Sequence, residues 1–473
     1  MKKDKTYIFE EMSVPKAVMT LAVPTVLGTL VMVIYSMVDT YFVGTLNDSV
    51  ETAAVTLASP VLLAFNAINN LFGVGGSSMM SRALGRKDID TVERSSCFGF
   101  YCSLVCALVF SLVLTVFQKP FLTLLGATDD TYEATAQYLL WTTSFGAVPA
   151  IMNVVMGYFV RAEGASVHAS IGTMSGCLLN IVLDPIFILP WGLGMGAAGA
   201  GLATFVSNCV ACAYFLILIL SRRGKGKTNI CLNPRKFSFR KTIVLEVFGV
   251  GIPAAIQNLL NVVGMTVLNN FTAEYGSDAV AAMGIAQKIN MIPLYIAMGF
   301  SQGIMPLVSY NYASGNSARM KKTILFSLAS ALGLLLIMTV VLYAGSGFFV
   351  SLFMKSESVV AYGKRFLRGM CLALPFLCLD FMAVGVFQAC GKGTIALVFA
   401  ILRKVVLEIP ALIVLNILFP LYGLAYAQMT AEIVMAVAGT VMLIRLFRRL
   451  KKRTGNGGPD APADTPESEP QSE

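Results

Sequence analysis

Charged residues are scarce in this sequence. They make up 13% of its 473 residues, whereas a typical soluble protein carries about 25%. Histidine is scarcer still: His168 is the only one, which excludes most histidine-based metal sites and catalytic mechanisms. The charges that are present cluster between apolar stretches long enough to cross a hydrocarbon core about 30 Å thick. The sequence therefore predicts an integral membrane protein.

Motifs of enzymes and of nucleotide-driven pumps are missing as well. Neither HExxH nor GxSxG occurs, and the GKT at 226–228 follows Ser221 where a phosphate-binding loop needs glycine. Cys209 and Cys212 form a CxxC inside an apolar stretch without a second pair, so interior packing is the favoured interpretation. We therefore expect no enzymatic activity, no cofactor and no nucleotide binding.

Twelve membrane-spanning helices are expected from the apolar stretches. They lie near residues 18–43, 54–79, 97–117, 134–158, 169–190, 198–220, 245–272, 280–306, 323–350, 369–390, 395–417 and 423–444. With these spans, 27 of the 35 Lys and Arg residues fall on one side, which the positive-inside rule makes cytoplasmic, together with both termini. The +9 net charge then reflects topology rather than nucleic-acid binding. Basic residues at 355–368 fall on the other side, and we expect an amphipathic stretch there.

The chain consists of two similar halves. VPTVLGTL at 23–30 resembles IPAAIQNL at 252–259, and later motifs keep the same offset. Six spans per half give both halves the same orientation, a parallel repeat that suits a transporter with its site between two lobes. The expected division is an N-lobe at 1–221, a basic cytoplasmic connector at 222–244, a C-lobe at 245–453 and an acidic cytoplasmic tail at 454–473, whose composition predicts disorder.

Two acids lie within the spans of the first half. Asp39 and Asp184 are each roughly 8–9 Å below the outer end of their span, with Asn180 one turn from Asp184 and Thr204 at a similar depth. No Lys or Arg lies in the first six spans to neutralise them. A charge in the bilayer costs at least about 2.5–3.5 kcal/mol, so it indicates a function. These four residues predict a proton or Na⁺ site, the alternative being water-exposed residues that line a vestibule.

The spans of the second half hold charges of both signs. They are Asp380, Glu408, Glu432, Lys288, Arg403 and Lys404. Because Lys404 and Glu408 are four residues apart on one helix, structural ion pairs are as good an interpretation as a functional site. Asp380 is still a candidate cation or substrate contact, together with Gln257 and Asn261 of the seventh span.

Pro24 and Gly28 lie on the inner side of the first span. Proline removes a helical hydrogen bond and glycine loosens packing, so a kink is expected there. The residues alone favour a static kink.

Three motifs give the sequence a resemblance to a known family. They are PTVLGTLVMVIYSMVDTYFVG at 24–44, LGRKD at 84–88 and NIVLDP at 180–185. With these motifs in order, the chain resembles the multidrug and toxic compound extrusion (MATE) family, and in particular its MepA-like bacterial branch, over about residues 5–450. The resemblance implies an all-α fold of twelve spans in two six-helix lobes around a central cleft. It also implies a multidrug antiporter that exports bulky, often cationic, drugs in exchange for H⁺ or Na⁺.

The resemblance further implies roles for the residues of the N-lobe. Asp39 matches the coupling aspartate of the family, Asn180, Asp184 and Thr204 match its partners, and Pro24 matches the proline that bends the first helix.

Some relatives use a glutamate of helix seven with an aspartate of helix ten instead. Here the seventh span has Gln257 and Asn261, and only Asp380 is near the helix-ten position. The expected cation site is therefore the one in the N-lobe.

The expected context is a bacterial cytoplasmic membrane, crossed by a monomer that transports drug-like organic cations. A flippase for lipid-linked sugars or a metabolite exporter of the same superfamily is the alternative. Acids rather than a row of basic residues in the first six spans favour the drug exporter.

Overall fold

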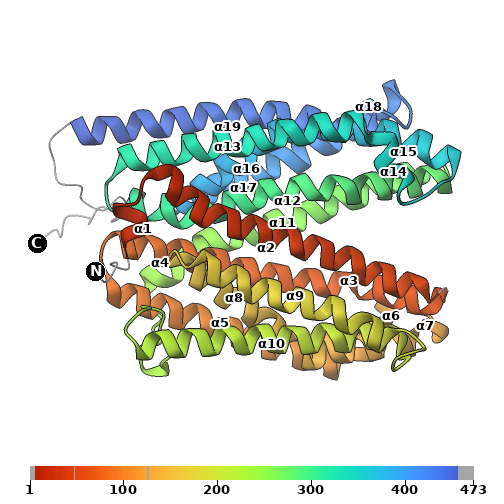
Figure 1. Cartoon of the computed structure of the whole chain (residues 1–473), viewed down its shortest axis with the longest axis horizontal. Coiled ribbons are helices and arrows are strands. Elements are labelled where there is room, and N and C mark those ends of the chain that lie inside the picture. Colours follow the sequence, from red (N-terminus) through yellow and green to blue (C-terminus); the bar gives the residue numbers. More distant parts are fainter. Residues whose placement is uncertain (1–5, 47, 125–126, 456–473) are drawn as a thin grey trace, which may run out of the picture.

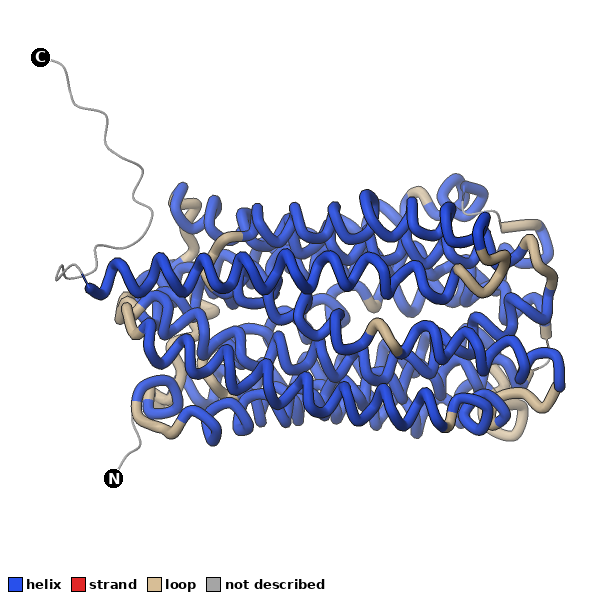
Figure 2. Tube along the Cα trace, turned by 90° about the horizontal axis from the view of Figure 1, so that it is seen from above, coloured by secondary structure: helices blue, strands red, loops and turns tan. Residues whose placement is uncertain are grey.

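The computed structural model describes residues 6–46, 48–124 and 127–455, and within these ranges the regular elements are helices throughout. Most of them run along the long axis of the molecule (Figures 1 and 2). The first helix, the end of the last helix and the connector between the halves lie at one end, on the left in Figure 1. We call this the basic end, and the other the far end.

The first half of the chain forms a helical bundle with two π-helical segments, η1 and η2. Its elements are α1 (Tyr7–Glu10), α2 (Val14–Thr45), α3 (Ser49–Asn69), η1 (Asn70–Val74), α4 (Gly75–Gly85), α5 (Ile89–Val116), α6 (Gln118–Leu124), α7 (Asp129–Leu139), η2 (Leu140–Phe145), α8 (Ala147–Ala162), α9 (Ser166–Ile188) and α10 (Gly196–Gly224). Aspartates begin two of them: Asp88 accepts a hydrogen bond from the Thr91 amide at the start of α5 (3.0 Å), and Asp48 caps α3 in the same way.

The second half forms a similar bundle with one π-helical segment, η4. A short 3₁₀ turn, η3 (Pro234–Lys236), precedes it. Its elements are α11 (Lys241–Ala273), α12 (Ser277–Ala313), α13 (Ser317–Ala344), α14 (Ser346–Ser351), α15 (Glu357–Cys371), α16 (Leu374–Ala389), α17 (Gly393–Ile401), η4 (Leu402–Glu408), α18 (Ile409–Leu418) and α19 (Leu424–Gly455). Of the predicted acidic tail, residues 456–473 lie outside the described part of the chain.

Each of the twelve expected spans has a helical counterpart. By length and composition, nine helices of the described chain can cross a membrane, and two bent helix pairs would add one span each. The bends are 49° between η2 and α8 and 44° between α15 and α16. The remaining span, expected near 395–417, coincides with α17, η4 and α18, which follow one another without a break. The prediction of an all-α membrane fold is confirmed.

Of the basic residues before the tenth span, Lys364, Arg365 and Arg368 belong to α15, which is the amphipathic stretch expected there, and Lys355 precedes it. Phe366 of this helix is buried. On its exposed side, the guanidinium of Arg365 lies 4.6 Å from the ring centre of Tyr422. Arg368 lies over Tyr343 in the same way, at 5.0 Å, and donates to its carbonyl. These arginines therefore cover aromatic rings at the far end.

The connector predicted at 222–244 is partly helical, because α10 continues to Gly224 and α11 begins at Lys241. The segment between them packs against the first half. The Tyr101 hydroxyl donates to the carbonyl of Leu232 (2.7 Å), and Lys236 contacts Glu93 at 3.1 Å. The hydrogen bond to the Glu93 carboxylate raises the pKa of Lys236.

The two halves meet closely near the basic end. Arg82 of α4 forms an ion pair of 3.1 Å with Glu246 of α11. A Cβ atom on Gly251 of α11 would collide with the carbonyl of Leu71, so glycine is required for this approach. Toward the far end the two groups of helices diverge (Figure 1).

α1 belongs to the first half of the chain but is held by the second. The guanidinium of Arg319 donates to the carbonyls of Ile8, Phe9 and Met12, which stand near the C-terminal end of α1. The Phe9 ring stacks on Tyr310 of α12 at 4.8 Å. α1 therefore ties the two halves together at the basic end.

Candidate cation site

The acids of the first half come from two neighbouring helices. Asp39 lies on α2, while Asn180 and Asp184 are one turn apart on α9 and face the same way. Asp184 and Asn180 are almost completely buried, at 0% and 2% exposure, and Asp39 is half-buried. Thr204 of α10 completes the group. The structure thus brings together the four residues that the sequence pointed to.

Asn180 connects α9 to α10 at this site. With its amide nitrogen turned toward Asp184, it donates to the two carboxylate oxygens at 2.9 and 3.3 Å. Its oxygen then accepts from the backbone N–H of Thr204 at 3.1 Å. This orientation satisfies both ends of the amide, whereas in the other the nitrogen reaches only the Thr204 hydroxyl, at 3.4 Å.

Two tyrosines belong to the same group and were not predicted. Tyr35 lies one turn before Asp39 on α2 and shares a hydrogen bond with the Thr204 side chain. Tyr138 of α7 is buried and close enough to both aspartates to interact with their charges. Tyr35 could have been found from the sequence, because it is four residues before Asp39 and therefore on the same face of the helix. Nothing in the sequence marks Tyr138, which comes from a different span.

Asp39 and Asp184 are near enough for their charges to interact. Among the described residues, no Lys or Arg forms an ion pair with either of them. Two like charges that share a buried site favour binding of a cation or proton, because the bound ion neutralises one of the two negative charges.

Pro24 and Gly28 lie on α2 between this site and the basic end. α2 is one continuous helix with Pro24 inside it. Gly28 faces α9, and a Cβ atom there would lie 3.5 Å from the hydroxyl of Ser170, an ordinary contact. A role for either residue in bending the helix stays a prediction.

The candidate residues of the second half form a buried ion-pair network. Arg403 of η4 contacts Asp380 at 3.1 Å and Glu432 at 3.7 Å, donates to Asn261 at 2.7 Å, and lies over the ring of Phe381. This is the geometry of structural ion pairs, the first of the two interpretations given above. A cation or substrate role for Asp380 stays a prediction.

A second pair extends this network. Lys404 and Glu408 meet at 2.7 Å one turn apart on η4, as their spacing indicates. Gln257 lies outside the network, since its side chain accepts from Gln388 at 3.2 Å.

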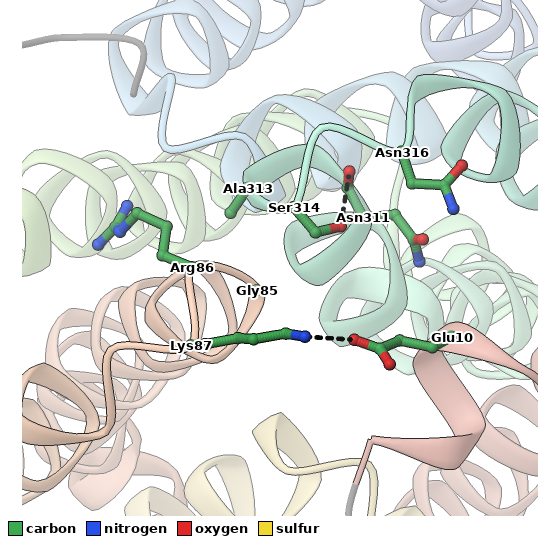
Figure 3. A pocket seen from close by; sticks show the side chains of 8 residues that line it. All are labelled: Glu10, Gly85, Arg86, Lys87, Asn311, Ala313, Ser314 and Asn316. Atoms are coloured by element: carbon green, nitrogen blue, oxygen red, sulfur yellow. Dashed lines mark hydrogen bonds and ion pairs between the residues drawn. The ribbon is translucent and has the colours of Figure 1, made fainter. Parts of the chain in front are cut away.

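A pocket of about 680 Å³ opens at the basic end between α4 and α12 (Figure 3). It is lined by Glu10, Gly85, Arg86, Lys87, Asn311, Ala313, Ser314 and Asn316. Lys87 and Glu10 reach toward each other across it, at 3.9 Å. None of the residues singled out in the sequence as site candidates lines this pocket.

In the described chain, the acid pair included, no three His, Cys, Asp or Glu side chains gather in a way that could hold a metal ion. The acid pair of α2 and α9 is the leading candidate site because, among the described residues, its charges have no basic partner. A helical membrane protein with paired halves and an unneutralised acid pair inside one of them has the build of a secondary transporter.

Comparison with known proteins places the chain in a family. The MatE family profile matches residues 24–186 and 253–414, one match in each half. The multidrug export protein MepA of Staphylococcus haemolyticus is 36% identical over 95% of this chain and 98% of its own length. MepA of Staphylococcus aureus strain MRSA252 is 33% identical over the same shares. The chain belongs to the MatE family of multidrug and toxic compound extrusion transporters.

Solved structures show the same fold. A crystal structure of MATE in the straight conformation gives a TM-score of 0.89 at 24% identity, covering 96% of this chain and 100% of that one. An outward-facing MATE family transporter of the MOP superfamily gives 0.87 at the same identity and coverage.

Proposed function

We propose that this protein is an antiporter that exports bulky, drug-like organic cations by alternating access, and that H⁺ is the coupling ion. The observation that carries the proposal is the pair Asp39 and Asp184, which lies inside a membrane bundle without a basic partner. Membership of the MatE family and the MepA relatives, named multidrug export proteins, support drugs as the substrate class.

The arrangement of Asn180 favours H⁺ over Na⁺. Its amide nitrogen donates to Asp184 and one lone pair of its oxygen accepts from the Thr204 amide, so the residue offers a metal cation at most one further lone pair. Na⁺, like other hard cations, needs several oxygen ligands at once. A proton needs only one carboxylate oxygen.

Exchange of drug for protons follows from the acid pair. A proton from outside neutralises one charge of the pair, which weakens the hold on a cationic drug and releases it. The first helix then changes its bend near Pro24 and the lobes reclose. Proton binding drives this change only if the pair has different proton affinities in the two conformations.

Close contact of the halves at the basic end supports an outward-open state, with that end in the cytoplasm. The Lys and Arg residues gathered there fit the positive-inside rule. We place both termini in the cytoplasm of a bacterium and the protein in its cytoplasmic membrane, as a monomer.

Ethidium efflux from proteoliposomes tests the proposal. An imposed pH gradient is expected to drive efflux from vesicles that contain the purified protein, and a Na⁺ gradient of equal size is not. Protein-free vesicles give the background rate. Efflux driven by Na⁺ alone would refute H⁺ as the coupling ion. No efflux with either gradient would overturn the drug-exporter assignment in favour of a flippase or a metabolite exporter.

A further inference from the structure

Basic residues gather on one helix at the far end. Of the five Lys and Arg residues that the expected spans leave on that side, four lie within 355–368, although the positive-inside rule makes such residues rare outside the cytoplasm. Lys364, Arg365 and Arg368 share one side of α15, which we call the basic face. Among the described residues no acid forms an ion pair with any of them, and Glu357, the only acid of α15, lies about two turns before Lys364. The described chain therefore provides no anion to pair with these charges.

The basic face points away from the first half of the chain. Phe366, on the opposite side of α15, is buried in a hydrophobic cluster with residues of α12, and α12 in turn packs against α2. On the two flanks α15 lies close to α14 and α19, since a Cβ atom on Gly363 would be 2.7 Å from Val350 and one on Gly369 would be 2.9 Å from Ala425. Only the basic face is left uncovered. It therefore looks outward from the bundle at the far end, and not into the space between the halves (Figure 1).

Contacts within the second half hold the three cations in place. Aromatic rings lie against the guanidinium groups of Arg365 and Arg368, at 4.6 and 5.0 Å. Arg368 also donates to the hydroxyl of Ser346 at 3.0 Å. The stem of Lys364 runs along α14, because a Cβ atom on Gly347 would lie 3.6 Å from its Cδ. Side chains that are already ordered lose less conformational entropy when a ligand binds.

The basic face stands where the membrane-spanning helices end, with apolar side chains next to it. Tyr343, whose ring lies under Arg368, is the second-last residue of α13, a helix able to cross a membrane. Val340 and Ile337, about one and two turns deeper on α13, are exposed at 67% and 62%. Phe348 of α14 is exposed at 64%. A lipid whose acyl chains cover these side chains has its phosphate at the level of the basic face.

We propose that the basic face of α15 binds the headgroup of an acidic phospholipid in the leaflet at the far end, which is the outer leaflet in the orientation proposed above. The lipid phosphate supplies the negative charge and the acceptor oxygens that arginine and lysine bind. The acyl chains cover the exposed apolar side chains of α13 and α14. A zwitterionic lipid would bring a cationic group to this surface as well, so an acidic headgroup is preferred. The inference does not depend on drug export or on the coupling ion.

Quenching of tryptophan fluorescence by brominated lipid tests this at the basic face itself. Phe348→Trp places the fluorophore beside the face, and Trp141→Phe and Trp191→Phe remove the two natural tryptophans. The full chain is reconstituted in phosphatidylcholine vesicles that contain an increasing fraction of dibrominated phosphatidylglycerol or, separately, of dibrominated phosphatidylcholine. Bromine quenches only a nearby tryptophan, so acidic lipid bound to the many basic residues at the basic end does not contribute.

The brominated phosphatidylglycerol is expected to quench at lower fractions than the brominated phosphatidylcholine. Changing both Lys364→Gln and Arg365→Gln should lower this preference at least about fivefold, the contribution of one basic residue near an acidic lipid surface. High salt should lower it as well, because salt screens exposed charges. The matched control changes two exposed lysines at the other end of α13, Lys321→Gln and Lys322→Gln, and should leave the preference unchanged.

Equal quenching by the two brominated lipids, or an undiminished preference in the double variant, would overturn the inference. An excess of inorganic phosphate at constant ionic strength separates a lipid from a soluble anion. Quenching that persists supports the lipid, whereas quenching that is lost would assign the basic face to a small anion. If the double variant does not fold, which gel filtration shows, the single variants Lys364→Gln and Arg365→Gln decide, and each is expected to lower the preference.

Discussion

We expect Asp39→Asn to reduce ethidium efflux driven by a pH gradient by at least about tenfold, within the range of typical coupling energies. The asparagine side chain has nearly the same size as aspartate but takes up no proton near neutral pH, and the Asp184 carboxylate that remains binds a proton less readily without a second negative charge beside it. The measurement is the initial rate of efflux from proteoliposomes at matched protein content.

The matched control is Asp130→Asn, the same chemical change at an exposed position at the start of α7. It is expected to keep the parent rate. Efflux by Asp39→Asn at the parent rate would mean that coupling lies elsewhere, with Asp380 as the next candidate.

Arg403→Met is the change with the largest expected effect on stability. It leaves Asp380 and Glu432 buried at 1% exposure each without their cation. Removing one partner of a buried ion pair costs about 3–5 kcal/mol. The thermal unfolding midpoint in detergent is therefore expected to fall by several degrees.

Two further variants test whether the loss of stability comes from the buried charges left without a partner. Arg365→Met removes an exposed arginine that lies over Tyr422, and it should change the midpoint little. Adding Asp380→Asn to Arg403→Met removes one of the orphaned charges and should recover part of the loss. An unchanged midpoint in Arg403→Met would show that the network contributes little to stability.

The sequence located the acid pair because charge is conspicuous in an apolar span. Asp39 and Asp184 stood out for this reason, and Asn180 followed from its place one turn before Asp184. Tyr138 could not be found in this way, because the sequence of one span does not show which residues of other helices its aromatic side chains approach. Its part in the site depends on how α7 packs against α3 and α10.

In the second half, sequence spacing predicted only the local part of the network. Lys404 and Glu408 are one turn apart, which marks them as a pair on any helix. The contacts of Arg403 with Asp380 and Glu432 join three helices, and such contacts depend on packing that no spacing within one span reveals. The helical counterparts of the twelve spans, by contrast, followed from length and hydrophobicity alone.

Proton release on drug binding tests the central claim most directly. When ethidium is added to the purified protein in weakly buffered solution near neutral pH, we expect about one proton to be released per ethidium bound, because both ligands neutralise the same acid pair. In Asp39→Asn the release should be lost. Ethidium binding without proton release in the unmodified protein, or equal release from Asp39→Asn, would contradict exchange of drug and proton at this site.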